Sequence, residues 1–246
     1  VKDTVKYYHE DNFANVPELT MAWPTVEQYN PDSYALNVLA TYLSDGKKAP
    51  FYKVLVEDKQ LTSNVQMFNG DSEVAGDFQL SVRAFSGKDL DTVSSAIDEA
   101  FAKFEKDGIS ETDLSRIKAG QERQFYNSLS SVLGKGAQLA QGNIFANDPG
   151  ILEKDIQRIL AVTPADVKRV YEKYVKGKNY VATSFVPKGK IDLALDGSKK
   201  AEVVEEKIVT GADAEVDASA QAKYERTPSS FDRSVEPPYG PAPEVK

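Results

Sequence analysis

The feature that most constrains the fold is a change of hydrophobic period at Gly87. In the stretch "AGDFQLSVRAF" (residues 75–85), apolar and polar residues alternate, which is typical of a strand with one buried face. Beyond Gly87, apolar residues recur every three to four positions for about ninety residues, as in a succession of amphipathic helices. Because strands and helices are partly segregated, the pattern predicts an α+β domain whose helices pack on one face of a largely antiparallel sheet.

Three more strands accompany this one, and each is an alternating or apolar run between turn residues. The short polar stretch "DSE" (residues 71–73) joins two of the strands, so we predict an antiparallel hairpin there. The four predicted strands span residues 17–25, 61–70, 75–85 and 179–187.

Cap residues mark the starts of several predicted helices. Asn30 caps the first long helix and Thr163 the last, and a proline follows each cap at the first helical position. A short second helix is predicted in "FYKVLVEDK" (residues 51–59), and four helices follow the change of period. The predicted order over residues 13–187 is therefore β-α-α-β-β-α-α-α-α-β.

Composition narrows the classes of function. The net charge of −8 and pI near 4.9 argue against a nucleic-acid or phosphate-binding surface. The absence of cysteine excludes disulfides, thiolate zinc sites and a cysteine nucleophile, and the single histidine excludes a two-histidine metal motif within this chain. No stretch approaches the roughly 18 apolar residues of a membrane span.

That single histidine lies in "YYHED" (residues 7–11). His9, Glu10 and Asp11 are of the types that bind metals or carry protons. A metal site needs two or three further ligands, however, and no carboxylate pair at helical spacing accompanies this histidine. We therefore interpret His9 as a surface residue that precedes the first strand, and we assign no site to it.

Two stretches combine glycine with lysine. "LGKGAQ" (residues 133–138) lacks the spacing of a Walker A loop and does not follow a strand, so we interpret it as a structural turn between helices. "SDGKKAPF" (residues 44–51) is interpreted as an exposed turn with solvated lysines, and the alternative is contact with acidic peptide side chains. Residue patterns alone thus indicate an α+β domain without a recognisable active site.

The two ends differ in character from the domain between them. Residues 188–246 are rich in Lys, Glu, Asp and Ala, and five prolines fall within the last nineteen positions. "EVVEEKIV" within this region is a candidate edge strand, and the Pro-rich end is typical of an extended linker. We expect residues 1–12 to connect from a preceding domain and residues 188–246 to lead toward a following one.

Several stretches together resemble one known family. "ELTMAWPTVEQYNPDSYALNVLATYL" and "FYKVLVEDKQL" resemble the opening of a domain of the insulinase/pitrilysin and mitochondrial-processing-peptidase family. "SLSSVLGKGAQLAQGNIFANDP" and "VTPADVKRVYEKYV" resemble the family's later helices. The order and spacing of these motifs are similar across residues 13–187.

The resemblance implies a fold and a role. Members of this family are zinc metallopeptidases built from repeated α+β domains around a chamber, and their zinc site is an H-x-x-E-H motif that this chain lacks. Active assemblies also use an Arg and a Tyr that position the substrate, and "LVEDKQLTS" has Val56 and Ser63 at those places. The resemblance therefore implies a non-catalytic domain like the second domain of the long bacterial members, with zinc in the catalytic domain of the parent protein.

Partners and location follow from the same resemblance. We expect the domain to pack on the catalytic domain of the same protein and to line a peptide-binding chamber, with a bacterial periplasm or cell envelope as the suggested location. Two glycine-lysine segments are the expected contacts to peptide or neighbouring domain: Gly46, Lys47 and Lys48, and Gly134, Lys135 and Gly136. The alternative is a catalytically dead assembly subunit, which would be indicated if no H-x-x-E-H motif lies upstream in the same gene.

Overall fold

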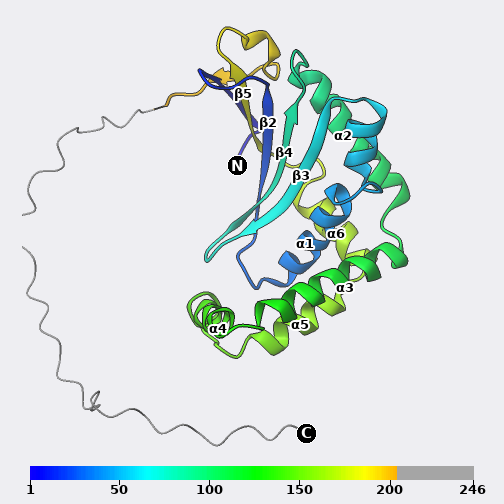
Figure 1. Cartoon of the computed structure of the whole chain (residues 1–246), viewed down its shortest axis with the longest axis vertical. Coiled ribbons are helices and arrows are strands. Elements are labelled where there is room, and N and C mark those ends of the chain that lie inside the picture. Colours follow the sequence, from blue (N-terminus) through cyan, green and yellow to red (C-terminus); the bar gives the residue numbers. More distant parts are fainter. Residues whose placement is uncertain (204–246) are drawn as a thin grey trace, which may run out of the picture. The chain divides into compact units, whose positions relative to one another are not determined.

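The computed structural model describes residues 1–203, which form a sheet with helices gathered on one side of it (Figure 1). The sheet has six strands in the order β3-β4-β2-β5-β1-β6. The strands are β1 (Val5–Asp11), β2 (Glu18–Thr25), β3 (Thr62–Asp71), β4 (Gly76–Ala84), β5 (Val181–Pro187) and β6 (Lys199–Lys200). The pairs β3–β4, β4–β2 and β2–β5 are antiparallel, whereas β1 is parallel to β5 and β6. The predicted α+β class and the largely antiparallel sheet are thus confirmed.

Five α-helices, rather than the four predicted, lie between β4 and β5. The helices of the described residues are α1 (Pro31–Ser44), the π-helix η1 (Tyr52–Asp58), α2 (Leu90–Asp107), α3 (Glu111–Ser128), α4 (Val132–Ala146), α5 (Leu152–Ala161), α6 (Pro164–Tyr174) and the 3₁₀ turn η2 (Ile191–Leu193). The helix missing from the prediction is α5. Its N-cap position is Ile151, which makes no side-chain cap hydrogen bond, so the usual start signal is absent from the sequence.

The cap residues used in the sequence analysis act as caps. The side chain of Asn30 accepts a hydrogen bond from the backbone N–H of Asp32. Thr163 and Asp166 form a reciprocal capping box at the start of α6. These hydrogen bonds satisfy N–H groups that the first turn of a helix leaves without a partner, which explains where α1 and α6 begin.

The core lies between the sheet and the helices. Inward-facing residues of β2 and β4 alternate with outward-facing ones, so Leu19 and Leu80 are fully buried on the helix side. From the helices, α1 and α2 contribute the apolar stripes that cover this face. An aromatic group fills the centre, where the ring of Phe101 lies 5.0 Å from Phe51 and 6.1 Å from Trp23, both in edge-to-face arrangements.

Residues near the N-terminus, which the sequence analysis placed in a connector, form β1. This strand pairs with β5 over its whole length, from Val5 opposite Val181 to Asp11 opposite Pro187. Its side chains are mostly half-buried on both faces, so the sequence shows no alternation, and main-chain pairing defines the strand instead. Of the expected linker 188–246, residues 188–203 include η2 and β6, whereas its remainder, including most of "EVVEEKIV" and the Pro-rich end, lies outside the described residues.

Candidate functional site

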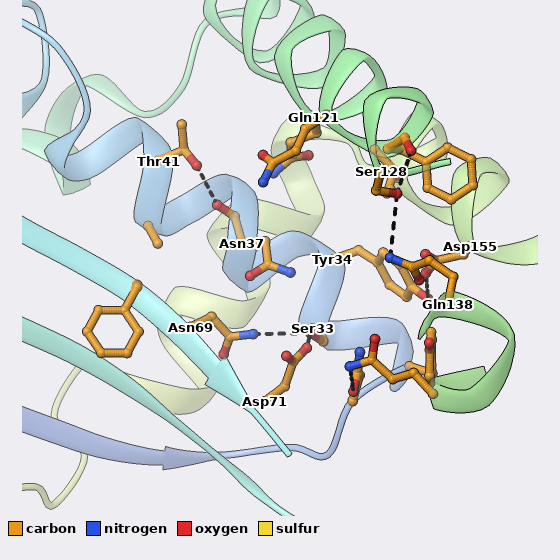
Figure 2. Close-up of a pocket in the computed structure, with 18 of the residues that line it drawn as sticks. Ser33, Tyr34, Asn37, Thr41, Asn69, Asp71, Gln121, Ser128, Gln138 and Asp155 are labelled. Atoms are coloured by element: carbon orange, nitrogen blue, oxygen red, sulfur yellow. Dashed lines mark hydrogen bonds between the residues drawn. The ribbon is translucent and has the colours of Figure 1, made fainter. Parts of the chain in front are cut away.

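A pocket of about 480 Å³ opens beside β3, the terminal strand at one edge of the sheet. It is lined by the loop before α1, by α1 and β3, and by α3, α4 and α5. Figure 2 shows side chains from β3 and from the helices converging on this space. The pocket therefore combines a sheet edge with polar helix faces.

The main chain of β3 is open toward this side only near the end of the strand, at Asn69 and Asp71. Ser72 N–H donates to the carbonyl of Ala75 at 3.0 Å and closes the β3–β4 hairpin. Counting back along β3 from this pair, every second residue forms main-chain hydrogen bonds with β4, and the residues between them do not. By this alternation, Met67, Asn69 and Asp71 direct their N–H and C=O groups away from β4. The N–H of Met67 donates to Ser44 Oγ at 3.2 Å, in agreement with that direction. Beyond Met67, the outer edge at Asn69 and Asp71 faces the pocket, which these two residues line.

A polar network joins α1 to β3 across the pocket floor. Ser33 Oγ donates to Asp71 Oδ2, and Asn69 Nδ2 donates to Ser33 Oγ at 3.1 Å. Ser33 is buried, so these hydrogen bonds satisfy a hydroxyl that would otherwise be desolvated without partners. The network fixes the first turn of α1 against the open edge of the sheet.

A second carboxylate enters from α5. Tyr34 OH donates to Asp155 Oδ1 at 2.6 Å. The pKa of Asp155 is raised, chiefly because the carboxyl is buried. The negative charge of Asp71 also raises this pKa, whereas the hydrogen bond from Tyr34 and the positive charge of Arg158 lower it. Burial and the hydrogen bond to Asp155 likewise raise the pKa of Tyr34. The pocket thus contains two carboxylates close enough to influence each other.

The rest of the lining is neutral and rich in hydrogen-bonding groups. Seven side-chain amides line the pocket, and neither Lys nor Arg is among its lining residues. Arg158 lies close by, but its Nη1 donates to the carbonyl of Tyr29 at 2.9 Å and its guanidinium lies 5.8 Å from the ring centre of Tyr34. Amides, hydroxyls and carboxylates of this kind suit the binding of a polar or cationic ligand. Within residues 1–203, no group of three or more histidine or acidic side chains is placed to hold a metal ion.

The glycine-lysine stretches expected as contacts do not line this pocket. Gly46 lies in the turn after α1 with φ of +82°, and Lys47 and Lys48 are exposed. Gly134 and Gly136 lie in the first turns of α4, so the interpretation of "LGKGAQ" as a turn between helices was wrong. The helix begins there because Ser131 Oγ accepts a hydrogen bond from Gly134 N–H at 3.0 Å.

The remaining residues considered from sequence lie apart from the pocket. His9 is on β1 and packs edge-on against Phe185, with ring centres 5.7 Å apart. Val56 is on the π-helix and packs against the core, and Ser63 is exposed at the start of β3. Neither Val56 nor Ser63 carries a group that could position a substrate as Arg and Tyr do.

Sequence reasoning missed the residues that form the pocket. Ser33, Asn69 and Asp71 come from two elements that are distant in sequence, and only the hairpin register and the position of α1 bring them together. One signal was available locally. Gln121 and Gln124, like Gln138 and Gln141, are three positions apart, which places each pair on one helix face.

Comparisons with known proteins agree with this architecture. The model of the peptidase M16 inactive domain matches residues 2–121. A protease from Helicobacter pylori has a TM-score of 0.67 at 21% identity, over 75% of this chain and 44% of that chain. The inactive peptidase domain of a proposed zinc protease from Bordetella parapertussis has a TM-score of 0.63 at 20% identity, over 71% of this chain and 92% of that chain. A chain of complex III2 from Candida albicans has a TM-score of 0.63 at 14% identity, over 74% of this chain and 46% of that chain.

These likenesses to solved structures, all below 25% identity, show the fold. No curated protein matches the sequence. The chain spans less than half the length of the Helicobacter protease. Among the described residues, no helix combines the length and the apolar character that crossing a membrane requires. The resemblance to the insulinase and processing-peptidase family is confirmed: residues 2–121 match the model of the peptidase M16 inactive domain, and the fold is shared with solved structures that include an inactive peptidase domain.

Proposed function

We propose that this chain is the non-catalytic domain of a zinc-dependent peptidase, where it packs on the catalytic domain of the same protein and lines the chamber that holds peptides. The zinc would be bound by the catalytic domain. The likeness to the Bordetella structure supports this role, because that structure is an inactive peptidase domain whose parent is described as a proposed zinc protease. The experiment below separates this role from catalysis by the chain itself.

The observation that carries the peptide-holding role is the open edge of β3 beside a polar pocket. An extended peptide can add to such an edge as a further strand, because its main chain supplies the hydrogen bonds that the edge lacks. Asn69 and Asp71 present their main-chain groups to the pocket, whose volume of about 480 Å³ is within the range of ligand sites. The pocket has hydrogen-bonding groups for a bound chain.

The two glycine-lysine segments flank elements that line the pocket. Gly46, Lys47 and Lys48 follow the C-terminus of α1, which contributes Thr41 to the lining. Gly134, Lys135 and Gly136 begin α4, which contributes Gln138 and Gln141. Both segments are mostly exposed, so we retain them as proposed contacts to the catalytic domain or to a peptide that extends beyond the pocket.

The test compares this chain with its full-length parent. Zinc content is measured by mass spectrometry, and cleavage is followed on a mixture of quenched-fluorescent peptides with and without chelator. We expect zinc and chelator-sensitive cleavage only in the parent, and peptide binding without cleavage by the chain alone. Cleavage by a metal-checked sample of the chain alone would overturn the assignment as a non-catalytic domain.

The second candidate is a catalytically dead assembly subunit. The similarity to a chain of complex III2 from Candida albicans favours it, because that chain is part of a complex whose name does not describe a peptidase. The same measurements decide between the two candidates. Absence of zinc and of cleavage in the parent as well as in the chain would favour the assembly role.

A further inference from the structure

The half of α3 beside the pocket departs from the usual pattern of a core helix. Its buried apolar residues, Leu114 and Ile117, lie in the first half of the helix. In the second half, the face directed at the pocket carries Gln121, Gln124 and Ser128, which helical spacing places on one side. The helix therefore changes from packing on the core to presenting amides toward the edge of β3.

Helix α4 extends this polar surface. Gln138 and Gln141 line the pocket, and they are held by hydrogen bonds from Gln138 Nε2 to Ser128 Oγ at 3.5 Å and from Gln141 Nε2 to Gln28 Oε1 at 3.2 Å. The side chains of Gln121 and Gln124 make no hydrogen bond to another residue within the described part of the chain. We call the four residues Gln121, Gln124, Gln138 and Gln141 the glutamine face.

A peptide strand has two edges. If one edge pairs with β3, its other edge carries N–H and C=O groups of alternate residues that still need partners in a partly enclosed site. A glutamine side chain offers both a donor and an acceptor, so it can satisfy either group. The glutamine face lines the same pocket as Asn69 and Asp71, and Figure 2 shows Gln121 and Gln138 directed toward the space that these residues border.

We propose that the glutamine face recognises the main chain of a bound extended peptide along the edge that β3 leaves free. The inference rests on the proposed peptide-holding function and adds the class of ligand. The pocket binds unfolded segments of varied sequence, because the edge of β3 and the glutamine face both form hydrogen bonds with main-chain N–H and C=O groups. Every residue except proline has both groups. Recognition of this kind suits a domain that holds a chain while another domain cuts it.

The test uses the complete chain and a fluorescein-labelled peptide of about ten residues that alternates Thr and Lys and so favours an extended conformation. A second peptide carries N-methyl groups on every Thr, which removes the N–H donors of one edge and leaves the charge unchanged. Binding is followed by fluorescence anisotropy. The methylated peptide can still place its intact edge on β3, so any loss of affinity reports on the opposite edge.

We expect the chain to bind the N-methylated peptide about tenfold more weakly than the unmodified one, as the loss of a small number of net hydrogen bonds predicts. A variant with Gln121→Leu and Gln124→Leu should bind both peptides equally and weakly. The control variant Gln157→Leu, at an exposed position of α5 outside the pocket, should keep the tenfold difference.

Two outcomes overturn the inference, and they are distinguishable. Equal affinity of the unaltered chain for both peptides would show that only one edge is read, and the proposed peptide-holding function would remain. Binding of neither peptide would remove the peptide-holding part of the proposed function together with this inference.

Discussion

Asp32 and Arg169 form an ion pair in which Arg169 Nη1 lies 2.7 Å from Asp32 Oδ1, and this pair ties the first turn of α1 to α6. Lys173 and Tyr174 of α6 donate to the other oxygen of the same carboxylate, at 2.8 and 2.7 Å. Asp32 is buried to 7% residual exposure. Helix α1, which lines the pocket, is therefore held in place by three hydrogen-bond donors from α6, about 140 residues later in the chain.

The first prediction concerns acid stability. Burial would raise the pKa of Asp32, but the hydrogen bonds from Lys173, Tyr174 and Arg169 outweigh it and lower the pKa from 3.8 to about 2. A carboxyl whose pKa is lower in the folded state stabilises the fold above its unfolded pKa, and this contribution is lost as the pH falls from 3.8 to about 2. We expect Asp32→Asn to lower the free energy of unfolding by about 2 kcal/mol at pH 7.

Urea titrations of the unaltered chain and of Asp32→Asn at several pH values check this prediction. The difference in unfolding free energy between the two proteins should be constant near neutral pH and should shrink below about pH 4. Glu57→Gln serves as control, because Glu57 pairs with Lys53 at an exposed site where ion pairs contribute little. A difference that stays unchanged down to pH 2 would contradict the prediction.

The second prediction concerns the aromatic centre of the core. Phe101 contacts Trp23, Phe51 and Tyr171, with ring centres 5.0 to 6.1 Å apart. Truncation would leave a cavity that these large rings cannot close, so Phe101→Ala should lower the free energy of unfolding by about 3–5 kcal/mol. Phe13→Ala is the matched control, since Phe13 is 90% exposed and its loss should change the free energy by less than about 0.5 kcal/mol. Chemical denaturation followed by tryptophan fluorescence at Trp23 measures both.

The elements that could be predicted are those defined by local signals. Asn30 and Thr163 cap their helices as expected, and the alternation of Phe78, Leu80 and Val82 places these residues in the core. The unpredicted strand β1 has no such signal, because it is half-buried on both faces and is defined by pairing with β5 from the far end of the domain. Local patterns cannot reveal a partner about 175 residues away.

The pocket was invisible to sequence analysis for a related reason. Its carboxylates, Asp71 and Asp155, belong to a hairpin and to a helix that lacks a start signal. Only tertiary packing brings both to α1, where Ser33 and Tyr34 donate to them. The glycines of α4 can be read from the sequence, but the reason why Gly134 is a glycine cannot. A Cβ atom on Gly134 would lie 2.0 Å from the carbonyl oxygen of Ser128.

The third prediction uses two glycines of the same helix turn. Gly134→Ala should destabilise the protein by about 1–3 kcal/mol, because its Cβ would collide with main chain that cannot rotate away. Gly136→Ala should stabilise it by about 0.5–1 kcal/mol, since no atom lies within 4 Å of that Cβ and alanine favours the helix. Thermal unfolding gives the sign of each change, and hydrogen exchange of the amides of α4 shows whether the effect is local. Effects of the same sign in both variants would contradict the steric argument.

The fourth prediction concerns the charge of a bound peptide. Asp71 and Asp155 line the pocket and no Lys or Arg is among its lining residues, so a peptide that carries Lys should bind more tightly than the same peptide with Glu. Asp155→Asn should weaken binding of the Lys peptide about fivefold and leave the Glu peptide unchanged or slightly improved. Isothermal titration at low salt measures both, and added salt should reduce the difference.

The control for this charge preference is Glu172→Gln, which makes the same change of net charge at an exposed position of α6 outside the pocket. Because the whole chain has a net charge of −8, it attracts basic peptides at long range wherever they bind. A general attraction would be reduced equally by both substitutions, whereas a site at Asp155 responds only to Asp155→Asn. If the two variants reduce binding of the Lys peptide equally, the preference for Lys comes from the overall charge of the chain. The pocket carboxylates would then have no specific role in peptide binding.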